Sequence, residues 1–304
     1  MHIAFNINEL GMPGLGATLR SMLLNCAQPH ELHLHFLVSR LAQRHRDNIV
    51  AHLAQCGGVG GCRFIEFDAD REFGDLPGLL GDRTAYGRLL LPDLLADVDE
   101  VLYLDADLLV QCDVRTLVSE HPLVGHNFAA VGFELDWAQD KVMLVKHGLT
   151  LQTQYFNSGV VAFNLARLRS EGASAAWRAF ARANRHELIS HDQTVLNAYA
   201  KGQYLALPSR FNLGWTAGKA QPGDCTGAIV HFFGSPKPWD PAGRLCHLGY
   251  GLWKRYSDPD WERQYLDLSV ARLKRLWQIR RSLVRVTRGA WKARQQAIKR
   301  TEPA

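Results

Sequence analysis

The sequence predicts an α/β fold in which helices flank a mostly parallel sheet. Short apolar runs alternate with segments of helical apolar spacing over about the first hundred residues, and this alternation is typical of parallel strands joined by helices. No apolar run reaches the roughly 18 residues that a transmembrane helix needs. A chain of 304 residues can bury one sizeable core. We therefore expect one domain over residues 1–256 and a C-terminal tail over residues 257–304.

The first half should supply the parallel strands. Apolar runs predict strands at residues 2–8, 32–38, 62–67 and 101–104, and helical spacing predicts helices at residues 14–27, 41–55 and 84–95. The second half is less regular: strands are expected at residues 128–133, 158–164, 204–208 and 228–233, and helices at residues 165–184 and 191–201. In such sheets, ligands bind at the carboxyl ends of the strands. Asp105 and Asp107 follow one such end directly.

These two aspartates are the strongest local feature. Two carboxylates after a buried strand are costly unless a positive charge compensates them. A divalent cation would do so, and hard oxygen ligands suit magnesium or manganese. The alternative is that one aspartate caps the next turn while the other is solvated, and Asp105-Ala106-Asp107 alone does not decide between the two.

Four further motifs occur in the chain. They are Tyr86-Gly87-Arg88, Asn157-Ser158-Gly159, His191-Asp192-Gln193, and the segment from His231 through Gly234 and Lys237 to Trp239. With the aspartate pair, this ordered set resembles the family 8 retaining glycosyltransferases over roughly residues 1–256, especially the bacterial galactosyl- and glucosyltransferases of lipopolysaccharide or lipooligosaccharide synthesis. The resemblance implies a GT-A-like fold and a hexosyltransferase that uses a uridine diphosphate (UDP) sugar.

The resemblance also implies roles for individual residues. Asp105, Asp107 and His231 match the ligands of a manganese ion, or magnesium, that bridges the donor diphosphate. The implied donor contacts are Asn8, Arg88, Asp105, Ala106, Asn157, Gly234 and Lys237. Asp192 and Gln193 match the pair beneath the anomeric carbon, and Ser158-Gly159 is expected to form a tight turn that presents Asn157. The alternative for Asp192 is a helix N-cap, and the two roles could coexist. A covalent intermediate and front-face attack both remain open, and we favour front-face attack with Gln193 as electrostatic support.

The first strand departs from the family pattern. The family usually has an aspartate at the strand end, often followed by Asp-Asn-Tyr, whereas this chain reads Asn8-Glu9-Leu10. The Asn8 amide can both donate to and accept from a uracil edge. Acceptor contacts are equally open, with Glu134 and Asp136 as candidates.

The tail concentrates positive charge. Residues from 271 onward contain 11 lysines or arginines and one acid, Glu302, so that the net charge of +5 divides into about −5 for residues 1–270 and about +10 for residues 271–304. Leu273, Leu276, Ile279, Leu283, Val286 and Ala290 recur at helical spacing with Trp277 and Trp291 nearby, although Gly289 could break the helix. A basic amphipathic helix fits an anionic membrane surface, a partner protein or a nucleic acid. Because the family's acceptors are lipid-linked, we favour the membrane and expect no nucleic acid.

Six scattered cysteines favour a reducing cytoplasm, and the N-terminus lacks a secretory signal pattern. The tail would then place the protein on the inner face of the cytoplasmic membrane. Two other function classes are considered. A sugar-nucleotide nucleotidyltransferase would need a Gly-rich loop followed by a basic residue after the first strand. Residues 11–16 are faintly like such a loop but lack the basic residue. A non-catalytic nucleotide-sugar-binding protein would bind nucleotide without transfer.

Overall fold

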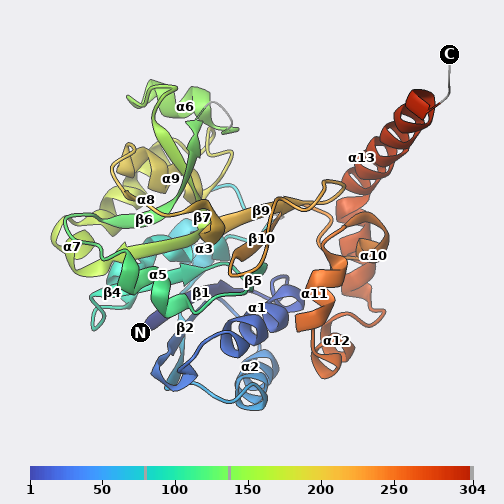
Figure 1. The fold of residues 1–304 in the computed structure, drawn as a ribbon. Coiled ribbons are helices and arrows are strands. Elements are labelled where there is room, and N and C mark those ends of the chain that lie inside the picture. Colours follow the sequence, from blue (N-terminus) through green and yellow to red (C-terminus); the bar gives the residue numbers. More distant parts are fainter. Residues whose placement is uncertain (79–80, 136–137, 302–304) are drawn as a thin grey trace.

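The computed structural model describes residues 1–78, 81–135 and 138–301, with the side chains of residue 271 and of residues beyond 288 left out. A seven-stranded sheet runs through the middle of the molecule (Figure 1). In spatial order its strands are β3 (Gly61–Glu66), β2 (His33–Val38), β1 (His2–Ile7), β4 (Glu100–Leu104), β7 (Gln154–Asn164), β6 (Phe128–Glu134) and β8 (Leu205–Ala206). Four of the six pairings are parallel, and the two that involve β7 are antiparallel. The predicted mostly parallel sheet is confirmed.

Helices cover both faces of this sheet (Figure 1). On one face lie α1 (Met12–Leu24) and α2 (Gln43–Gln55), and on the other lie α4 (Leu91–Leu94), α7 (Leu165–Ser170), α8 (Ala173–Ala183) and α9 (Asp192–Ala200). The shorter helices are α3 (Ala69–Phe73), α5 (Val114–Glu120), α6 (Lys141–Lys146), α10 (Gly243–Cys246), α11 (Tyr250–Tyr256) and α12 (Pro259–Tyr265). The long C-terminal helix is α13 (Val270–Thr301).

A smaller sheet extends the fold beside the ends of β4 and β7. It contains β5 (Leu108–Val110), β10 (Ile229–Phe233) and β9 (Leu213–Thr216), in that order. Strand β10 pairs with β5 in antiparallel register, with His231 opposite Leu108. This pairing brings the His231 segment, more than a hundred residues later in the chain, next to Asp107.

Some predicted elements differ in detail. The helix predicted at residues 84–95 is a 3₁₀ helix, η2 (Thr84–Leu90), followed by the single turn of α4, with Pro92 near its start. The helix predicted at residues 165–184 divides into α7 and α8 at Gly172, whose φ of 64° leaves the helical region. Ser158 and Gly159 lie inside β7, so the predicted tight turn is wrong. Helix α13 continues through Gly289, so the predicted break there is also wrong.

The beginning of the predicted tail packs against the body. The indole of Trp261 on α12 donates a hydrogen bond to the Met12 carbonyl at 2.8 Å and lies against Gly16 of α1. Tyr265 contacts His45 Nδ1 at 2.9 Å through its hydroxyl, and Ile279 of α13 is only 3% exposed. Residues beyond 256 therefore complete part of the body, and the domain boundary at 256 stays a prediction. Among the described residues, no helix has both the length and the apolar character that crossing a membrane requires.

Candidate active site

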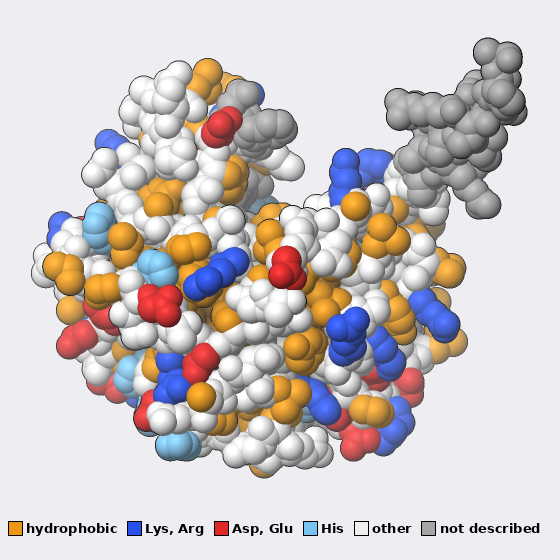
Figure 2. All heavy atoms as spheres, viewed as in Figure 1, with side chains coloured by type: hydrophobic (Ala, Val, Ile, Leu, Met, Phe, Trp, Pro, Cys, Tyr) orange, Lys and Arg blue, Asp and Glu red, His pale blue; other side chains and the backbone are white. Residues whose placement is uncertain are grey.

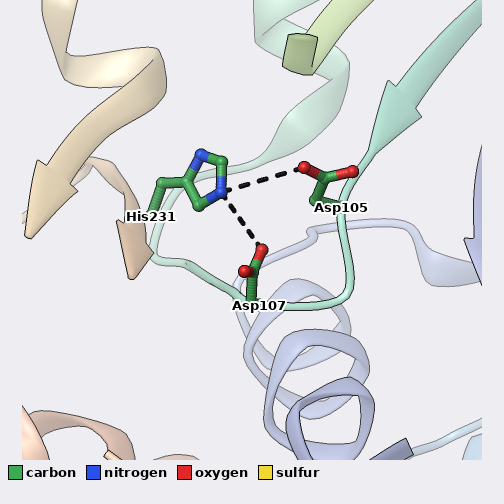
Figure 3. Close-up of side chains that lie close together, drawn as sticks. All are labelled: Asp105, Asp107 and His231. Atoms are coloured by element: carbon green, nitrogen blue, oxygen red, sulfur yellow. Dashed lines mark ion pairs between the residues drawn. The ribbon is translucent and has the colours of Figure 1, made fainter. Parts of the chain in front are cut away.

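Asp105, Asp107 and His231 meet at the carboxyl end of β4 (Figure 3). His231 Nε2 lies 3.1 Å from Asp107 Oδ1 and 3.8 Å from Asp105 Oδ2. One ligand atom from each residue falls within 4.8 Å of the others, which suits three ligands of a single ion. The sequence analysis proposed the same three residues.

The neighbouring strand fixes this geometry. The Asp105 backbone N–H donates to the Gly159 carbonyl on β7 at 2.8 Å. A Cβ atom at Gly159 would lie 2.3 Å from His231 Cε1 and 2.7 Å from Asp105 Oδ2. Glycine is therefore required here for a close approach, and not for the turn that we predicted.

The charges around Asp107 fit a cation. Asp107 Oδ1 is buried and accepts no hydrogen bond from any described residue, so one ligand atom is left for an ion. Lys237 Nζ lies 2.5 Å from Asp107 Oδ2 and also donates to the Phe232 carbonyl. Burial raises the pKa of Asp107, but Lys237 and His231 outweigh this effect and hold the pKa well below its usual range. The carboxylate is thus ionised and available as a ligand.

Arg88 ties together the acids on the other side of the site. Its Nη2 lies 2.9 Å from Asp105 Oδ1, its Nε lies 2.9 Å from Asp192 Oδ2, and its Nη1 donates to the Ser158 carbonyl and hydroxyl at 2.7 and 2.9 Å. Its guanidinium stacks 4.2 Å above the ring of Tyr103. Burial raises the pKa of Asp192 and Arg88 opposes that rise. Arg88 therefore holds Asp105, a candidate metal ligand, and Asp192 in fixed positions relative to each other.

A chain of hydrogen bonds links His231 to Gln193. His231 Nδ1 contacts Asn212 Oδ1 at 2.9 Å, Asn212 Nδ2 donates to Asn157 Oδ1 at 3.0 Å, and Asn157 Nδ2 donates to Gln193 Oε1 at 2.8 Å. Backbone donors fix the amide orientations, because Gly159 N–H donates to Asn157 Oδ1 and Ser158 N–H donates to Gln193 Oε1. The chain therefore requires a proton on His231 Nδ1, and Nε2 is the nitrogen that faces the two aspartates.

Two connected cavities surround these residues. The smaller, of about 310 Å³, is lined by Asn157, Asp192, Gln193 and Gly234, and the larger, of about 850 Å³, by Asn6, Asn8 and Ala106. Both include Arg88, Asp105, Asp107 and Lys237. All the catalytic, donor-contact and metal-ligand residues proposed from the sequence thus line these two cavities.

Two of the proposed donor contacts have less freedom than the sequence suggested. Asn8 Oδ1 accepts the Gly11 backbone N–H at 3.0 Å, so that one of the two lone pairs of this oxygen is already taken. The Asn157 amide is engaged by protein partners at both ends. The sequence analysis did not identify two further residues of the site, Asn212 and Tyr155. The Tyr155 hydroxyl accepts a hydrogen bond from Gln193 Nε2 at 2.7 Å. Of the acceptor candidates, Asp136 lies outside the described residues.

The sequence profile of glycosyl transferase family 8 matches residues 2–243. The chain belongs to glycosyl transferase family 8. It is therefore a retaining hexosyltransferase, as the resemblance implied. Similar curated proteins include a lipopolysaccharide 1,2-glucosyltransferase of Escherichia coli (strain K12), 25% identical over 79% of this chain and 72% of that protein.

Other relatives cover more of the chain. The lipopolysaccharide 1,3-galactosyltransferase of Salmonella typhimurium is 25% identical over 85% of this chain and 78% of that protein, and the general stress protein A of Bacillus subtilis is 25% identical over 85% and 96%. Among solved structures, the galactosyltransferase LgtC in complex with donor and acceptor sugar analogs superposes with a TM-score of 0.72 at 25% identity, covering 88% of this chain and all of that one. This likeness confirms the predicted GT-A-like fold.

Proposed function

We propose that this family 8 enzyme transfers galactose or glucose from a UDP-sugar to a saccharide acceptor with the help of Mn²⁺ or Mg²⁺. The observation that carries the proposal is the Asp105, Asp107 and His231 cluster, which lies beside Lys237 where the two cavities meet. Carboxylates and an imidazole suit these ions, and an ammonium suits phosphate oxygens. The larger cavity would hold the nucleoside and the smaller one the sugar.

The diphosphate would lie at the junction. When bound to Asp105, Asp107 and His231, the metal would neutralise charge that develops on the leaving diphosphate. Lys237 would turn from Asp107 towards the phosphate oxygens and add a second positive charge. Gly234, with a φ of 65°, lets the backbone before Lys237 pass close to the same oxygens.

The environment of Asp192 supports front-face attack. Its Oδ2 is engaged by both Arg88 and Ser158, and the residue is 5% exposed. A carboxylate held in this way is a poor nucleophile and a good anchor for Arg88. The Gln193 carbonyl oxygen is fixed by two donors and would stabilise positive charge at the anomeric carbon. The acceptor oxygen would then bond on the face from which the diphosphate leaves, and its proton would pass to the leaving phosphate oxygen.

The acceptor and the location are proposed from the relatives and the tail. Two of the similar enzymes carry names that place them in lipopolysaccharide synthesis, so we propose a saccharide or glycolipid acceptor of this kind. Figure 2 shows lysine and arginine side chains on the surface over the region of α10 to α13, on the right of the view. Arg281 and Arg285 of α13 are both exposed. We propose that this side rests on the anionic inner face of the cytoplasmic membrane.

The test is a panel of UDP-sugars incubated with the full chain and Mn²⁺, with release of UDP as the readout. We expect release from UDP-galactose or UDP-glucose, its loss with a chelator and its recovery when Mn²⁺ is restored. Asp107→Ala should lower turnover at least about a hundredfold while the far-UV circular dichroism stays unchanged. If wild type neither binds nor cleaves any nucleotide sugar, the proposal is wrong.

The same assay separates the two other function classes. Membership of family 8 argues against a nucleotidyltransferase. That class would form a UDP-sugar from a sugar phosphate and a nucleoside triphosphate, with release of pyrophosphate. A non-catalytic binding protein would bind UDP with Mn²⁺ and release nothing from the donor.

A further inference from the structure

The first turns of α13 form part of the wall of the larger cavity. Ser269, Arg272 and Arg275 line the space that Asp107 and Lys237 also line. The helix that we expected to serve as a separate membrane anchor thus reaches the proposed nucleotide site. Its two arginines there have different surroundings.

Arg275 is paired with an acid and a hydroxyl group. Its Nε and Nη2 lie 2.7 and 2.8 Å from the two oxygens of the buried Asp240, and Nη2 also donates to Ser235 Oγ at 3.0 Å. Asp240 in turn accepts the Lys237 backbone N–H at 2.7 Å. Arg275 therefore fixes the start of α13 to the loop that carries Lys237, and this anchoring gives the adjacent cavity wall a defined position.

Arg272, one turn earlier, has no such partner. It is partly buried, and no described residue forms a hydrogen bond or ion pair with its guanidinium. Burial lowers its pKa; the nearby Asp240 opposes this effect, but both oxygens of Asp240 are taken by Arg275. A desolvated guanidinium without a counterion is costly, and an anion in the cavity would compensate it.

We propose that Arg272 binds the diphosphate of the donor nucleotide on its nucleoside side. This inference rests on the proposed function. Arg272 lines the larger cavity with Asn8 and is absent from the smaller cavity, which contains Gln193. A guanidinium can pair with two phosphate oxygens at once, so Arg272 and Lys237 would hold the diphosphate from two walls. A residue outside the segment matched by the family would then contribute to donor binding.

The experiment measures binding of UDP and of uridine to the full chain with Mn²⁺ by isothermal titration calorimetry. We expect Arg272→Gln to weaken UDP binding about tenfold and to leave uridine binding unchanged, since uridine has no phosphate. Arg272→Lys should recover part of the affinity. The matched control is Arg281→Gln, which removes the same charge from an exposed position of the same helix and should leave UDP binding as in wild type.

A second arm uses phosphatidylglycerol vesicles, because a lipid headgroup also offers phosphate. Arg272→Gln should bind vesicles as wild type does. If Arg272→Gln loses vesicle binding and keeps UDP binding, or if Arg281→Gln weakens UDP binding equally, the inference is overturned. Unchanged UDP binding in Arg272→Gln, with tight binding by wild type, overturns this inference alone. Wild type that binds no nucleoside diphosphate overturns the proposed function.

Discussion

Asn212 determines which nitrogen of His231 faces the proposed metal. It accepts from His231 Nδ1 and donates to Asn157, so it connects the metal cluster to the sugar side of the site. Such partners of a ligating histidine typically contribute about ten- to a hundredfold to metal affinity. We expect Asn212→Leu to weaken Mn²⁺ binding by about that factor, measured by electron paramagnetic resonance of free Mn²⁺.

Asn212→Asp is the matched control for this prediction. It keeps an acceptor for His231 Nδ1 but loses the donor to Asn157, so Mn²⁺ affinity should be kept while the rate of UDP release falls. Equal Mn²⁺ affinity in wild type and Asn212→Leu would contradict the assigned role.

The residues found from the sequence are those in dense local motifs. Asp105 and Asp107 follow an apolar strand directly, and His231 lies in a distinctive segment with Lys237. Asn212 lies 19 residues before its partner in a segment without any motif. Its role depends on the pairing of β9 and β10, which is a tertiary property. The same reasoning applies to Arg272, whose approach to the cavity depends on how α12 and α13 pack.

At the scale of elements, β7 sets the distance between the sheet and the metal cluster. We expect Gly159→Ala to displace His231 or Asp105, because the added Cβ would overlap both. Overpacking of this kind costs about 1–3 kcal/mol, so Mn²⁺ affinity should fall about tenfold. Gly251→Ala on α11 is the control, since its added Cβ would meet open space. A calorimetric Mn²⁺ titration in the presence of UDP would measure both variants, and wild-type affinity in Gly159→Ala would contradict this account.

Helix α5 begins at an aspartate whose charge should make stability depend on pH. Asp113 accepts the Arg115 N–H at 3.0 Å and pairs with the Arg115 guanidinium at 2.7 Å. The hydrogen bond from Arg115 is the largest influence and lowers the pKa of Asp113 to about 2. Because the folded pKa lies below the unfolded value of about 4, the stabilisation is complete above that value and is lost as the pH falls towards 2.

Asp113→Asn should therefore lower the free energy of unfolding by about 1–2 kcal/mol at pH 7. The difference in free energy of unfolding between wild type and Asp113→Asn should become smaller as the pH falls from 4 to 2. Urea unfolding followed by circular dichroism at several pH values would measure it. A difference in free energy of unfolding that stays constant over this pH range would show that the charge of Asp113 does not contribute to stability.

Elements with clear periodicity were predictable, and very short ones were not. The buried strands β1, β2 and β4 appear as apolar runs, and α2 and α9 as helical spacing. Strand β5 has three residues and β9 has four, which is too short for any period to show. Yet β5 and β9 flank β10 and so position His231. The sequence thus predicted the main sheet better than the small sheet that completes the site.

At the scale of the whole molecule, the first and last parts of α13 differ in their expected contacts. Its first part contacts the body, with Ile279 buried and Val286 close to Gly218. Its last part carries Lys292, Arg294, Lys299 and Arg300 in the sequence. Contacts with the body should thus need only the first part, whereas an anionic membrane would attract the last part by about 1 kcal/mol for each basic residue near its surface.

Removal of residues 289–304 should therefore separate membrane binding from catalysis. We expect the shortened chain to release UDP from its donor in water at a rate within about twofold of wild type, because the described contacts between α13 and the body are kept. Its binding to phosphatidylglycerol vesicles in a sedimentation assay should fall at least about tenfold. Raising the salt concentration should weaken wild-type binding in the same direction, because the attraction is screened. Phosphatidylcholine vesicles should bind neither chain tightly, and undiminished binding of the shortened chain to anionic vesicles would place the membrane contact elsewhere on the protein.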